Sequence, residues 1–311
     1  MSSTPTSDQP IFAFGALRSG TTLLRLMLKH HPAIHSPGEA DFLFDHVMPQ
    51  GDGWRYDRDA LAADRIFRSK SVPLREGLQG AELAEALVAD LAATGEGLMS
   101  LNIHRNAPRM AALFPNAKII HLVRDPRDVA RSSIGMGWAG NSFFGVDHWV
   151  DTESDWDRAN YPEDQVLEVQ FEKLMADLEP ELARICTFLG LEFDPAMLTY
   201  YENSTYGPPD PKIAQKWREK ADPREVALIE GRAGALLEAR GYQSAGTPAL
   251  PGSLELARLK LENRWKRWRY NVRRYGFSLF AGHHLARTFG LKGLEAKLAA
   301  RQEAIRVASL Q

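Results

Sequence analysis

The sequence predicts an α/β fold, in which helices flank a parallel sheet and a basic helical appendage follows at the C-terminus. Two apolar runs, Ile11–Phe14 and Lys118–Val123, have the length of buried strands, and each leads directly into a helical pattern. Such strand–helix succession is typical of parallel sheets. Charge sets the tail apart: 13 Lys and Arg accompany 4 Glu from residue 253 onward, whereas the first 252 residues hold 25 basic and 36 acidic side chains.

The turn after the first strand contains Gly15 and Gly20, and a helix with apolar residues at 23–28 follows. Strand, glycine loop and helix form the phosphate-binding unit of P-loop proteins, because the backbone N–H groups and the helix N-terminus then point at one anion. The predicted sheet is therefore of the P-loop type. A plain strand–turn–helix, in which the glycines serve only the turn, is the alternative.

This loop lacks the lysine of nucleotide hydrolases. The glycine spacing matches G-x-x-x-x-G-K-[ST], but Thr21 stands at the lysine position. Without that lysine, the loop has no point charge for β- and γ-phosphates. The remaining donors suit a smaller 5′-phosphate group, and they are Arg18, Ser19, Thr21 and Thr22.

Composition limits the class of protein. A chain of 311 residues with 44% apolar side chains can bury a sizeable core. The single Cys186 excludes an intramolecular disulfide framework, and the polar residues 1–10 lack an apolar signal core. No apolar run has the length of a bilayer span, and no His, Cys and Asp cluster has metal-ligand spacing. We therefore expect a soluble, cytoplasmic protein that works without a metal.

An acidic candidate follows a second predicted strand at residues 33–36. Residues 37–39 then form a turn at the C-terminal end of that strand, where ligands bind in open α/β sheets. Glu39 would be well placed there as a general base, and a solvated or helix-capping glutamate is the alternative. Residues 41–98 look mostly helical with a break at 50–53, and we expect this excursion to shape an acceptor pocket.

A second phosphate contact is predicted after the strand Lys118–Val123. Arg124 leaves the C-terminal end of this strand, and Ser132 lies eight residues on, inside a helix expected from about Val129. Both side chains can reach a phosphate near the sheet edge, the arginine as a forked donor and the serine as a short hydroxyl. A structural network of arginines with the capping residue Asp125 is the alternative.

Two segments together carry a family resemblance: GALRSGTTLLRLML at residues 15–28 and IIHLVRDPRDVARSS at residues 119–133. They resemble the P-loop-fold sulfotransferases, which transfer a sulfuryl group from 3′-phosphoadenosine 5′-phosphosulfate (PAPS) to a hydroxyl or amine. The resemblance covers about residues 10–245. It implies that Arg18 takes leaving-group charge and that Arg124 and Ser132 hold the 3′-phosphate. It also implies a 5′-phosphosulfate site made of Arg18, Ser19, Gly20, Thr21 and Thr22.

Further segments extend the resemblance. Residues 36–39 resemble the Gly-Glu segment of the tyrosylprotein-like branch, whose glutamate deprotonates the acceptor, which implies that Glu39 is the catalytic base. Residues 204–218 resemble the segment that closes over the nucleotide, which implies nucleotide contacts by Lys212 and Trp217. For Trp217, a place in the core is the alternative.

One departure concerns the stabiliser of the leaving phosphate. Many family members carry a lysine-proline pair before the strand that leads to the 3′-phosphate, whereas residues 99–105 of this chain contain no lysine. His104, Arg105 or Lys212 could supply the missing charge, and the residues alone do not decide among them.

The remaining body is expected to hold a strand at 165–170 followed by a turn, and a final amphipathic helix over 221–242. These elements complete a predicted sulfotransferase domain at 10–245. A linker at 246–253 and a helical extension at 254–311 follow.

The extension has one apolar stripe at helical spacing, with basic residues on the other faces. Its members are Leu254, Ala257, Leu261, Trp265, Trp268, Val272 and Tyr275. We expect this helix to dock on the acidic body or on a second subunit of a homo-oligomer. Peripheral contact with an anionic inner-membrane surface is the alternative. Nucleic acid is not an expected partner, because no reading module accompanies the charge.

These observations predict a PAPS-dependent sulfotransferase that acts by in-line displacement on a small-molecule, glycan or lipid acceptor. Protein tyrosine is a further open acceptor class, because no motif in the excursion identifies the acceptor. Two other functions are compatible with the residues: a P-loop nucleotide kinase or NTPase, and a non-catalytic membrane- or partner-binding protein that retains the fold.

Overall fold

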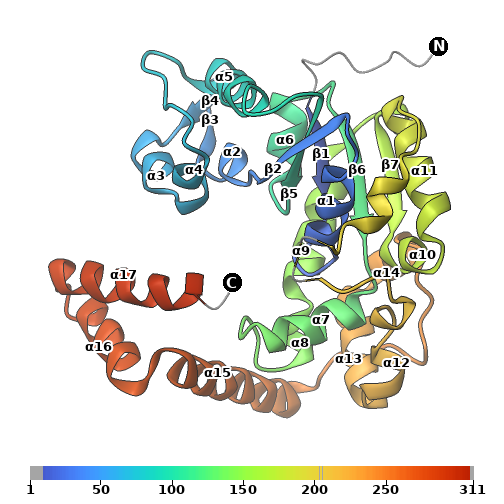
Figure 1. Cartoon of the computed structure of the whole chain (residues 1–311). Coiled ribbons are helices and arrows are strands. Elements are labelled where there is room, and N and C mark those ends of the chain that lie inside the picture. Colours follow the sequence, from blue (N-terminus) through green and yellow to red (C-terminus); the bar gives the residue numbers. More distant parts are fainter. Residues whose placement is uncertain (1–9, 203, 205, 309–311) are drawn as a thin grey trace.

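The computed structural model describes residues 10–202, 204 and 206–308; the polar start of the chain and Thr205 of the expected closing segment lie outside them. A five-stranded, wholly parallel sheet forms the centre of the body, in the order β2-β5-β1-β6-β7 (Figure 1). The predicted α/β class is thereby confirmed. The strands are β1 (Ile11–Phe14), β2 (Ile34–Glu39), β5 (Leu98–Ile103), β6 (Lys118–Val123) and β7 (Val166–Gln170).

Helices cover both faces of this sheet (Figure 1). Because successive strand residues point to opposite faces, Phe12 and Phe14 pack on one side of β1, and Ile11 and Ala13 pack on the other. The phenylalanine side is covered by α5 (Gly80–Ala92), α6 (Ala107–Leu113) and α9 (Asp147–Ala159). The opposite side is covered by α1 (Thr21–Lys29), α10 (Phe171–Ala176) and α11 (Leu178–Leu189).

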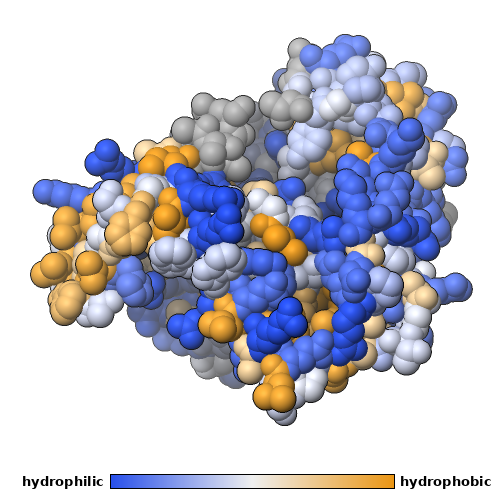
Figure 2. Space-filling model, turned by 90° about the horizontal axis from the view of Figure 1, so that it is seen from below, coloured by the Kyte–Doolittle hydropathy of each residue, from blue (hydrophilic) through white to orange (hydrophobic). Residues whose placement is uncertain are grey.

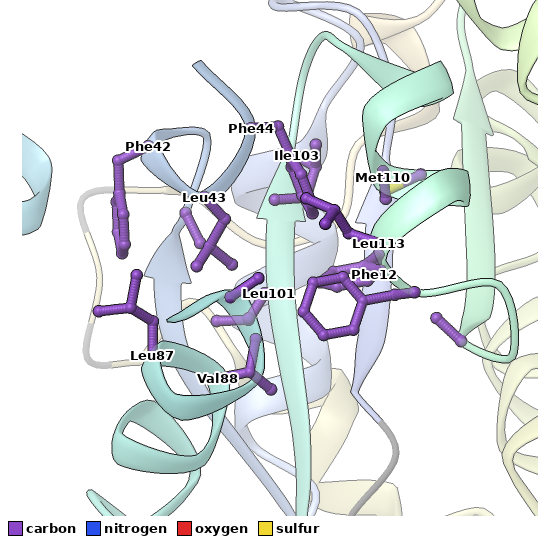
Figure 3. Close-up of a cluster of buried hydrophobic side chains, with 14 of the residues drawn as sticks. Phe12, Phe42, Leu43, Phe44, Leu87, Val88, Leu101, Ile103, Met110 and Leu113 are labelled. Carbon is purple, nitrogen blue, oxygen red and sulfur yellow. The ribbon is translucent and has the colours of Figure 1, made fainter. Parts of the chain in front are cut away.

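The phenylalanine side forms an aromatic and aliphatic core (Figure 3). The ring of Phe12 meets those of Phe44 and Phe114 edge-on, with centroids 5.7 and 5.5 Å apart. In Figure 3, Ile103 of β5 lies beside Phe44 and Leu101 of β5 lies beside Phe12. These four side chains and Phe114 are all buried. This packing fixes β1 and β5 beside each other, so the loops at their carboxyl ends share one edge of the sheet.

The second strand is longer than expected. It continues through residues 37–39, which were predicted to form a turn, so Glu39 is the last residue of β2. The pairing with β5 shifts register between His35 and Gly38, and Gly38 has a φ of 97°, a left-handed conformation that favours glycine. Because β2 is an edge strand, Pro37 is tolerated within it.

The excursion after β2 also differs from the expectation of mostly helix. It contains the hairpin β3 (Val47–Gln50) and β4 (Gly53–Tyr56), joined by the residues predicted to be a break. A two-residue turn at 51–52 fits such a hairpin, since Gly51 has a φ of 59°. The excursion's helices are α2 (Phe42–Asp45), α3 (Arg58–Ala63), α4 (Arg65–Lys70) and α5.

Two later expectations were wrong in detail. Helix α10 begins at Phe171, directly after β7, where a turn was expected. The single helix expected over 221–242 is divided into α13 (Pro223–Ala233) and α14 (Ala235–Ala239), because Gly234 has a φ of 58° and ends the first helix. The other body elements are α7 (Pro126–Gly135), α8 (Ser142–Gly145), α12 (Trp217–Lys220), and the short 3₁₀ turns η1 (Glu163–Gln165), η2 (Pro195–Thr199) and η3 (Pro211–Ile213).

The C-terminal part forms an arm of three helices that leaves the body below α7 and α8 (Figure 1). They are α15 (Ser253–Tyr275), α16 (Phe277–Thr288) and α17 (Lys292–Ala308). The predicted stripe lies on α15 but does not dock on the body: Leu254 is 90% exposed and Leu261 is 70% exposed. Among the described residues, no helix combines the length and the apolar character needed to cross a membrane.

Candidate active site

The loop between β1 and α1 is held in a tight curl. A Cβ on Gly15 would lie 2.4 Å from the Leu122 carbonyl oxygen, and one on Gly20 would lie 2.5 Å from the Phe171 ring. Gly20 also has a φ of 98°, and Arg18 has a φ of 74° although it is not glycine. Glycine is therefore required at both ends of the loop, as a phosphate-binding turn demands.

The loop presents unused donors at the start of α1. The Ser19 side chain is fully buried, and its hydroxyl has no hydrogen-bond partner. Helix α1 begins at Thr21 with no side-chain cap and no acidic residue in its first turn. A buried donor without a partner costs about 1–3 kcal/mol, and an uncapped helix N-terminus favours an anion. The residues present therefore fit a phosphate or phosphosulfate group.

The two predicted phosphate motifs meet at this edge. The Arg18 guanidinium donates from Nε to the Ser132 hydroxyl at 2.9 Å, and the Arg124 guanidinium donates from Nη1 to the Arg18 carbonyl oxygen at 3.2 Å. Ser132 lies inside α7, as expected, although this helix begins at Pro126 rather than near Val129. The structure thus brings Arg18, Ser132 and Arg124 together at the carboxyl ends of β1 and β6.

Arg124 also joins the site to the segment that carries Lys212. Its Nη2 donates to the Ile213 carbonyl oxygen at 3.0 Å, its guanidinium lies 4.3 Å from the centre of the Phe171 ring, and its Nε has no partner. Burial lowers the pKa of Arg124, and the carboxylates of Asp128 and Glu172 act in the opposite direction. A largely buried guanidinium with an unused donor is suited to bind an anion.

The capping network considered as the alternative exists, but it uses a different arginine. Asp125 caps α7 by accepting from the Arg127 backbone N–H at 2.9 Å, and it pairs with the Arg127 side chain at 2.7 Å. The same guanidinium contacts Glu230 at 2.6 Å. The structural pair at this turn is therefore Arg127–Asp125, which leaves Arg124 directed at the loop.

The two residues predicted to contact the nucleotide from the closing segment have different surroundings. Lys212 is exposed on η3, next to the carbonyl that Arg124 contacts. Trp217 is only 5% exposed; its indole N–H donates to Asp125 at 2.9 Å, and its ring lies 3.9 Å from the Arg127 guanidinium. The core reading of Trp217 matches these contacts, and nucleotide contact by either residue stays a prediction.

Glu39 is half-buried at the carboxyl end of β2, and charged groups surround it. Lys70 of α4 donates to the Pro37 carbonyl oxygen at 2.5 Å. Burial lowers the pKa of Lys70, while the Glu39 carboxylate acts to raise it. The Glu39 carboxylate therefore lies near enough to Lys70 and His104 to act on both electrostatically, and its role as the base stays a prediction.

A buried chain of three side chains runs from the excursion to the loop. His104, directly after β5, contacts Asp41 through Nδ1 at 2.8 Å and the Thr21 hydroxyl through Nε2 at 3.0 Å. Burial disfavours the charged imidazole, but the charge and hydrogen bond of Asp41, aided by Glu39, hold the pKa of His104 above its ordinary value. Arg105 donates to Asp45 at 2.7 Å, and its Nη1 lies 3.7 Å from the Asp41 carboxylate.

Sequence reasoning missed Asp41, Lys70, Asn102 and His148. Asn102 donates to the Thr21 carbonyl oxygen at 3.0 Å, and His148 lies 2.9 Å from the Leu17 carbonyl oxygen, so both hold the loop. Asp41 stands two residues after Glu39, which was a usable signal. His148 and Lys70 had no such signal in the sequence, because only the folding of α9 and α4 onto the site places them there.

Within the part of the chain that the structure describes, no group of three His, Cys, Asp or Glu side chains is arranged to hold a metal.

Known proteins resemble this chain over most of its body. The model of the sulfotransferase family matches residues 10–195. Protein-tyrosine sulfotransferase 1 of Danio rerio is 30% identical over 212 residues, which cover 63% of this chain and 57% of that protein. The sulfotransferase domain of the Synechococcus PCC 7002 olefin synthase superposes with a TM-score of 0.53 at 25% identity, covering 75% of this chain and 98% of that domain.

A second solved structure shares the fold. The sulfotransferase domain from the curacin biosynthetic pathway superposes with a TM-score of 0.56 at 21% identity, covering 78% of this chain and 99% of that domain. The family match covers more than half of the chain and includes both phosphate motifs and β2. This chain is therefore a member of the sulfotransferase family, as its two phosphate motifs predicted.

Proposed function

We propose that the protein transfers a sulfuryl group from PAPS to a hydroxyl or amine acceptor by in-line displacement, with Glu39 as the general base. The observation that carries this proposal is the 2.9 Å hydrogen bond between Arg18 and Ser132. It joins a loop suited to a 5′-phosphosulfate to a helix suited to a 3′-phosphate, and only a nucleotide with both groups would use both sites.

The residues of the candidate site would have separate roles in binding the donor and in transferring the proton. The loop N–H groups, Ser19 and Arg18 would bind the 5′ group and take the charge that develops on the leaving phosphate. Arg124 and Ser132 would fix the 3′-phosphate and hence the direction of the reacting bond. As the acceptor oxygen bonds to sulfur, the acceptor proton passes to the Glu39 carboxylate and the electron pair of the broken S–O bond passes to the phosphate.

The acceptor class is open to experiment. The excursion at 41–98 borders Glu39 and supplies Lys70, so it is the part of the chain that would contact the acceptor. The Danio rerio relative is named for protein tyrosine, and a phenolic hydroxyl is accordingly one candidate beside small alcohols, glycans and lipids.

Calorimetry with 3′,5′-adenosine bisphosphate (PAP) and with ATP, each with and without Mg²⁺, tests the donor. We expect micromolar binding of the bisphosphate that is independent of Mg²⁺, and much weaker binding of ATP. The opposite preference would replace this proposal with a nucleotide kinase or NTPase, the function that the absent loop lysine argues against.

A turnover assay tests the reaction. Labelled PAPS is incubated with a panel of phenols, alcohols, sugars and tyrosine-containing peptides, and transfer of the label is measured. Binding of the bisphosphate without transfer to any acceptor, while the intact donor stays unconsumed, would support a non-catalytic protein that retains the fold.

A further inference from the structure

The side chains of Asp41, His104 and Thr21 form a hydrogen-bonded chain that ends on the phosphate loop. All three side chains are at most 4% exposed. The Asp41 carboxylate accepts from the His104 backbone N–H at 2.7 Å and contacts the ring through its other oxygen at 2.8 Å. The opposite ring nitrogen lies 3.0 Å from the hydroxyl of Thr21, the residue that stands where nucleotide hydrolases carry lysine.

The protonation state of the ring decides what the Thr21 hydroxyl can do. An imidazolium donates from both nitrogens, so Thr21 accepts from Nε2 and its own hydrogen is free to point into the loop. A neutral ring that keeps its hydrogen on Nδ1 for Asp41 has an accepting Nε2, which takes the hydrogen of Thr21 instead. One proton therefore switches Thr21 between donating to the loop and donating to the ring.

The groups around His104 favour the imidazolium. Asp41 and Glu39 act on it as anions and Arg105 as a cation; Arg105 pairs with Asp45 and also lies 3.7 Å from Asp41. On the remaining side, the Thr152 hydroxyl of α9 donates to the His104 carbonyl oxygen at 3.0 Å. The two carboxylates outweigh both burial and Arg105, so the pKa of His104 lies above its ordinary value.

We propose that His104, anchored by Asp41, is a positioning residue that holds Thr21 as a hydrogen-bond donor to the 5′ group and brings a positive charge beside the loop. This inference rests on the proposed function, since it assigns a stabiliser to the same phosphate site. His104 keeps its proton throughout, and Thr21 donates a hydrogen bond rather than a proton. Of the three candidates for the missing lysine, His104 is the one whose side chain contacts the loop.

Binding of PAP, measured by calorimetry between pH 7 and 10, tests this inference without turnover. The range lies above the pKa of about 6 of the ligand's phosphates. We expect the wild-type affinity to fall as pH rises through the pKa of His104. The His104→Gln variant should bind about tenfold or more weakly at pH 7, because a charged hydrogen-bond partner is lost, and its affinity should change less with pH.

The His104→Lys variant provides the rescue. Its ammonium retains charge to higher pH, so affinity at pH 7 should return to near the wild-type value and the fall should move to higher pH. The His30→Gln variant is the matched control, because His30 lies at the far end of α1, where its ring contacts the Leu26 carbonyl oxygen. It should leave the affinity and its pH dependence unchanged.

Three results would overturn the inference: equal affinities of wild type and His104→Gln at every pH, a loss of affinity that leaves the pH dependence intact, or a lysine variant that binds no better than glutamine. Thermal melting of each variant shows whether it is folded. If the wild type does not bind the bisphosphate at all, the proposed function fails instead, so the two failures are distinguishable.

A second inference comes from how α15 distributes its charges. Both acidic residues of this helix turn toward the body: Glu255 pairs with Arg224 at 2.5 Å, and Glu262 lies 3.4 Å from the Asn141 amide. The helix is fastened there by further polar contacts, including one from the Gly140 N–H to the Asn263 side chain at 2.6 Å. The acids of α15 thus lie on its docked side.

The outward side of α15 is apolar and cationic. Leu254, Leu261, Trp265 and Trp268 are 90, 70, 51 and 46% exposed, and no residue of this helix is buried. Exposed cations flank this apolar line, with Arg258 and Arg269 on one side and Lys260, Arg264 and Arg267 on the other. Arg269 lies 5.3 Å from the Trp265 ring. An apolar line with tryptophans between two rows of cations suits the boundary of an anionic bilayer.

The exposed apolar surface continues along the arm. Phe277 and Phe289, on and just after α16, are 64 and 71% exposed, and Leu285, Leu291 and Leu294 are 47–53% exposed. Seen from below, the molecule shows orange apolar patches set among blue hydrophilic side chains, with a large group at the left, where Figure 1 shows α16 and α17 (Figure 2).

We propose that residues 253–294 lie on an anionic lipid surface, with the line of Trp265 and Trp268 at the acyl boundary and the flanking arginines at the headgroups. The segregation of charge on α15 carries this inference. Each cation near such a surface contributes about a fivefold gain in binding.

Co-sedimentation of the whole protein with vesicles tests this surface. We expect binding to vesicles of phosphatidylcholine with 30% phosphatidylglycerol, weak binding to pure phosphatidylcholine, and a blue shift of tryptophan emission on binding. The Arg264→Glu/Arg267→Glu variant should bind at least tenfold more weakly. The control Lys29→Glu/Lys220→Glu makes the same charge change on exposed residues of the body and should bind nearly as well as wild type.

Two results would contradict the proposed lipid surface. Failure to bind the anionic vesicles would overturn the inference. So would light scattering that shows a dimer without lipid, if Trp265→Ala/Trp268→Ala makes it monomeric, because a second copy would then cover this face.

Discussion

The Arg18 guanidinium donates a 2.9 Å hydrogen bond to the Ser132 hydroxyl, although 114 positions separate the two residues. Arg18 belongs to the loop after β1, and Ser132 belongs to the helix after β6. The contact forms because β1 and β6 are adjacent parallel strands, whose carboxyl ends lie at one edge of the sheet. A nucleotide bound there would be held by both motifs at once.

Arg124→Ala tests the 3′-phosphate site. The variant should bind 3′,5′-adenosine bisphosphate about 10–100-fold more weakly, because a charge-assisted hydrogen bond contributes about 1.5–3 kcal/mol. The affinity for adenosine 5′-monophosphate, which lacks the 3′ group, should fall much less. Calorimetry compares the two ligands. Arg131→Ala is the control, since Arg131 lies in α7, the helix that follows Arg124, and pairs with Glu225. Equal losses for both ligands would place Arg124 outside the 3′ site.

Glu39→Gln tests the base. Removing a general base lowers kcat by about 10²–10⁴-fold, while binding of the bisphosphate should stay within a factor of about three. Steady-state kinetics with the best acceptor of the panel, together with calorimetry, separates the two effects. A variant that turns over as fast as wild type would assign the base to another residue.

Gly20→Ala tests the shape of the loop. The new methyl would meet the Phe171 ring at 2.5 Å in a backbone conformation with a φ of 98°. We expect a loss of about 2–4 kcal/mol in the free energy of unfolding, measured by urea denaturation, because strain and overpacking add. Gly246→Ala is the control, since no atom lies within 4 Å of its added methyl and its φ is not positive. Equal stability of the two variants would contradict the crowded loop.

The Asp41–His104 pair predicts a pH dependence of stability. His104 helps to overcome the burial cost of Asp41 and holds the pKa of Asp41 below its ordinary value of 3.8, so the stability from Asp41 is present above about pH 4 and is lost as pH falls. The pKa of His104 is raised above 6.5, so its contribution is full below about pH 6.5 and is lost as pH rises through the folded pKa.

Urea denaturation from pH 3 to 9 measures this dependence. The difference in unfolding free energy between wild type and Asp41→Asn should be largest between about pH 4 and 6.5 and should shrink on both sides. A difference that is constant over this range would show that the pair does not titrate as its surroundings indicate.

The sequence by itself determined the features that depend on neighbouring residues. The apolar runs of β1 and β6, the glycines of the loop and the Arg124–Ser132 spacing are local patterns, and a strand followed by a loop and a helix follows from them. They were enough to indicate the fold class and the family, and they supplied the candidate residues of both phosphate sites.

Local sequence patterns gave wrong elements where contacts between distant segments determine the secondary structure. The strand β2 includes Pro37 and Gly38, which ordinarily indicate a turn, because pairing with β5 at the sheet edge outweighs their preference. The hairpin β3–β4 is short, and its pattern was weaker than the helical periodicity around it. Gly234, which divides α13 from α14, lies inside an amphipathic pattern that continues past it.

Only the tertiary structure decided which side chains meet. His104 reaches Thr21 across 83 positions, and Lys70 reaches the end of β2 across 33, because the packing of the excursion onto the sheet brings them there. Periodicity likewise did not determine what the apolar stripe on α15 contacts. It shows that a helix has an apolar face, but not what that face packs against. Such placements depend on long-range packing, and no local pattern encodes them.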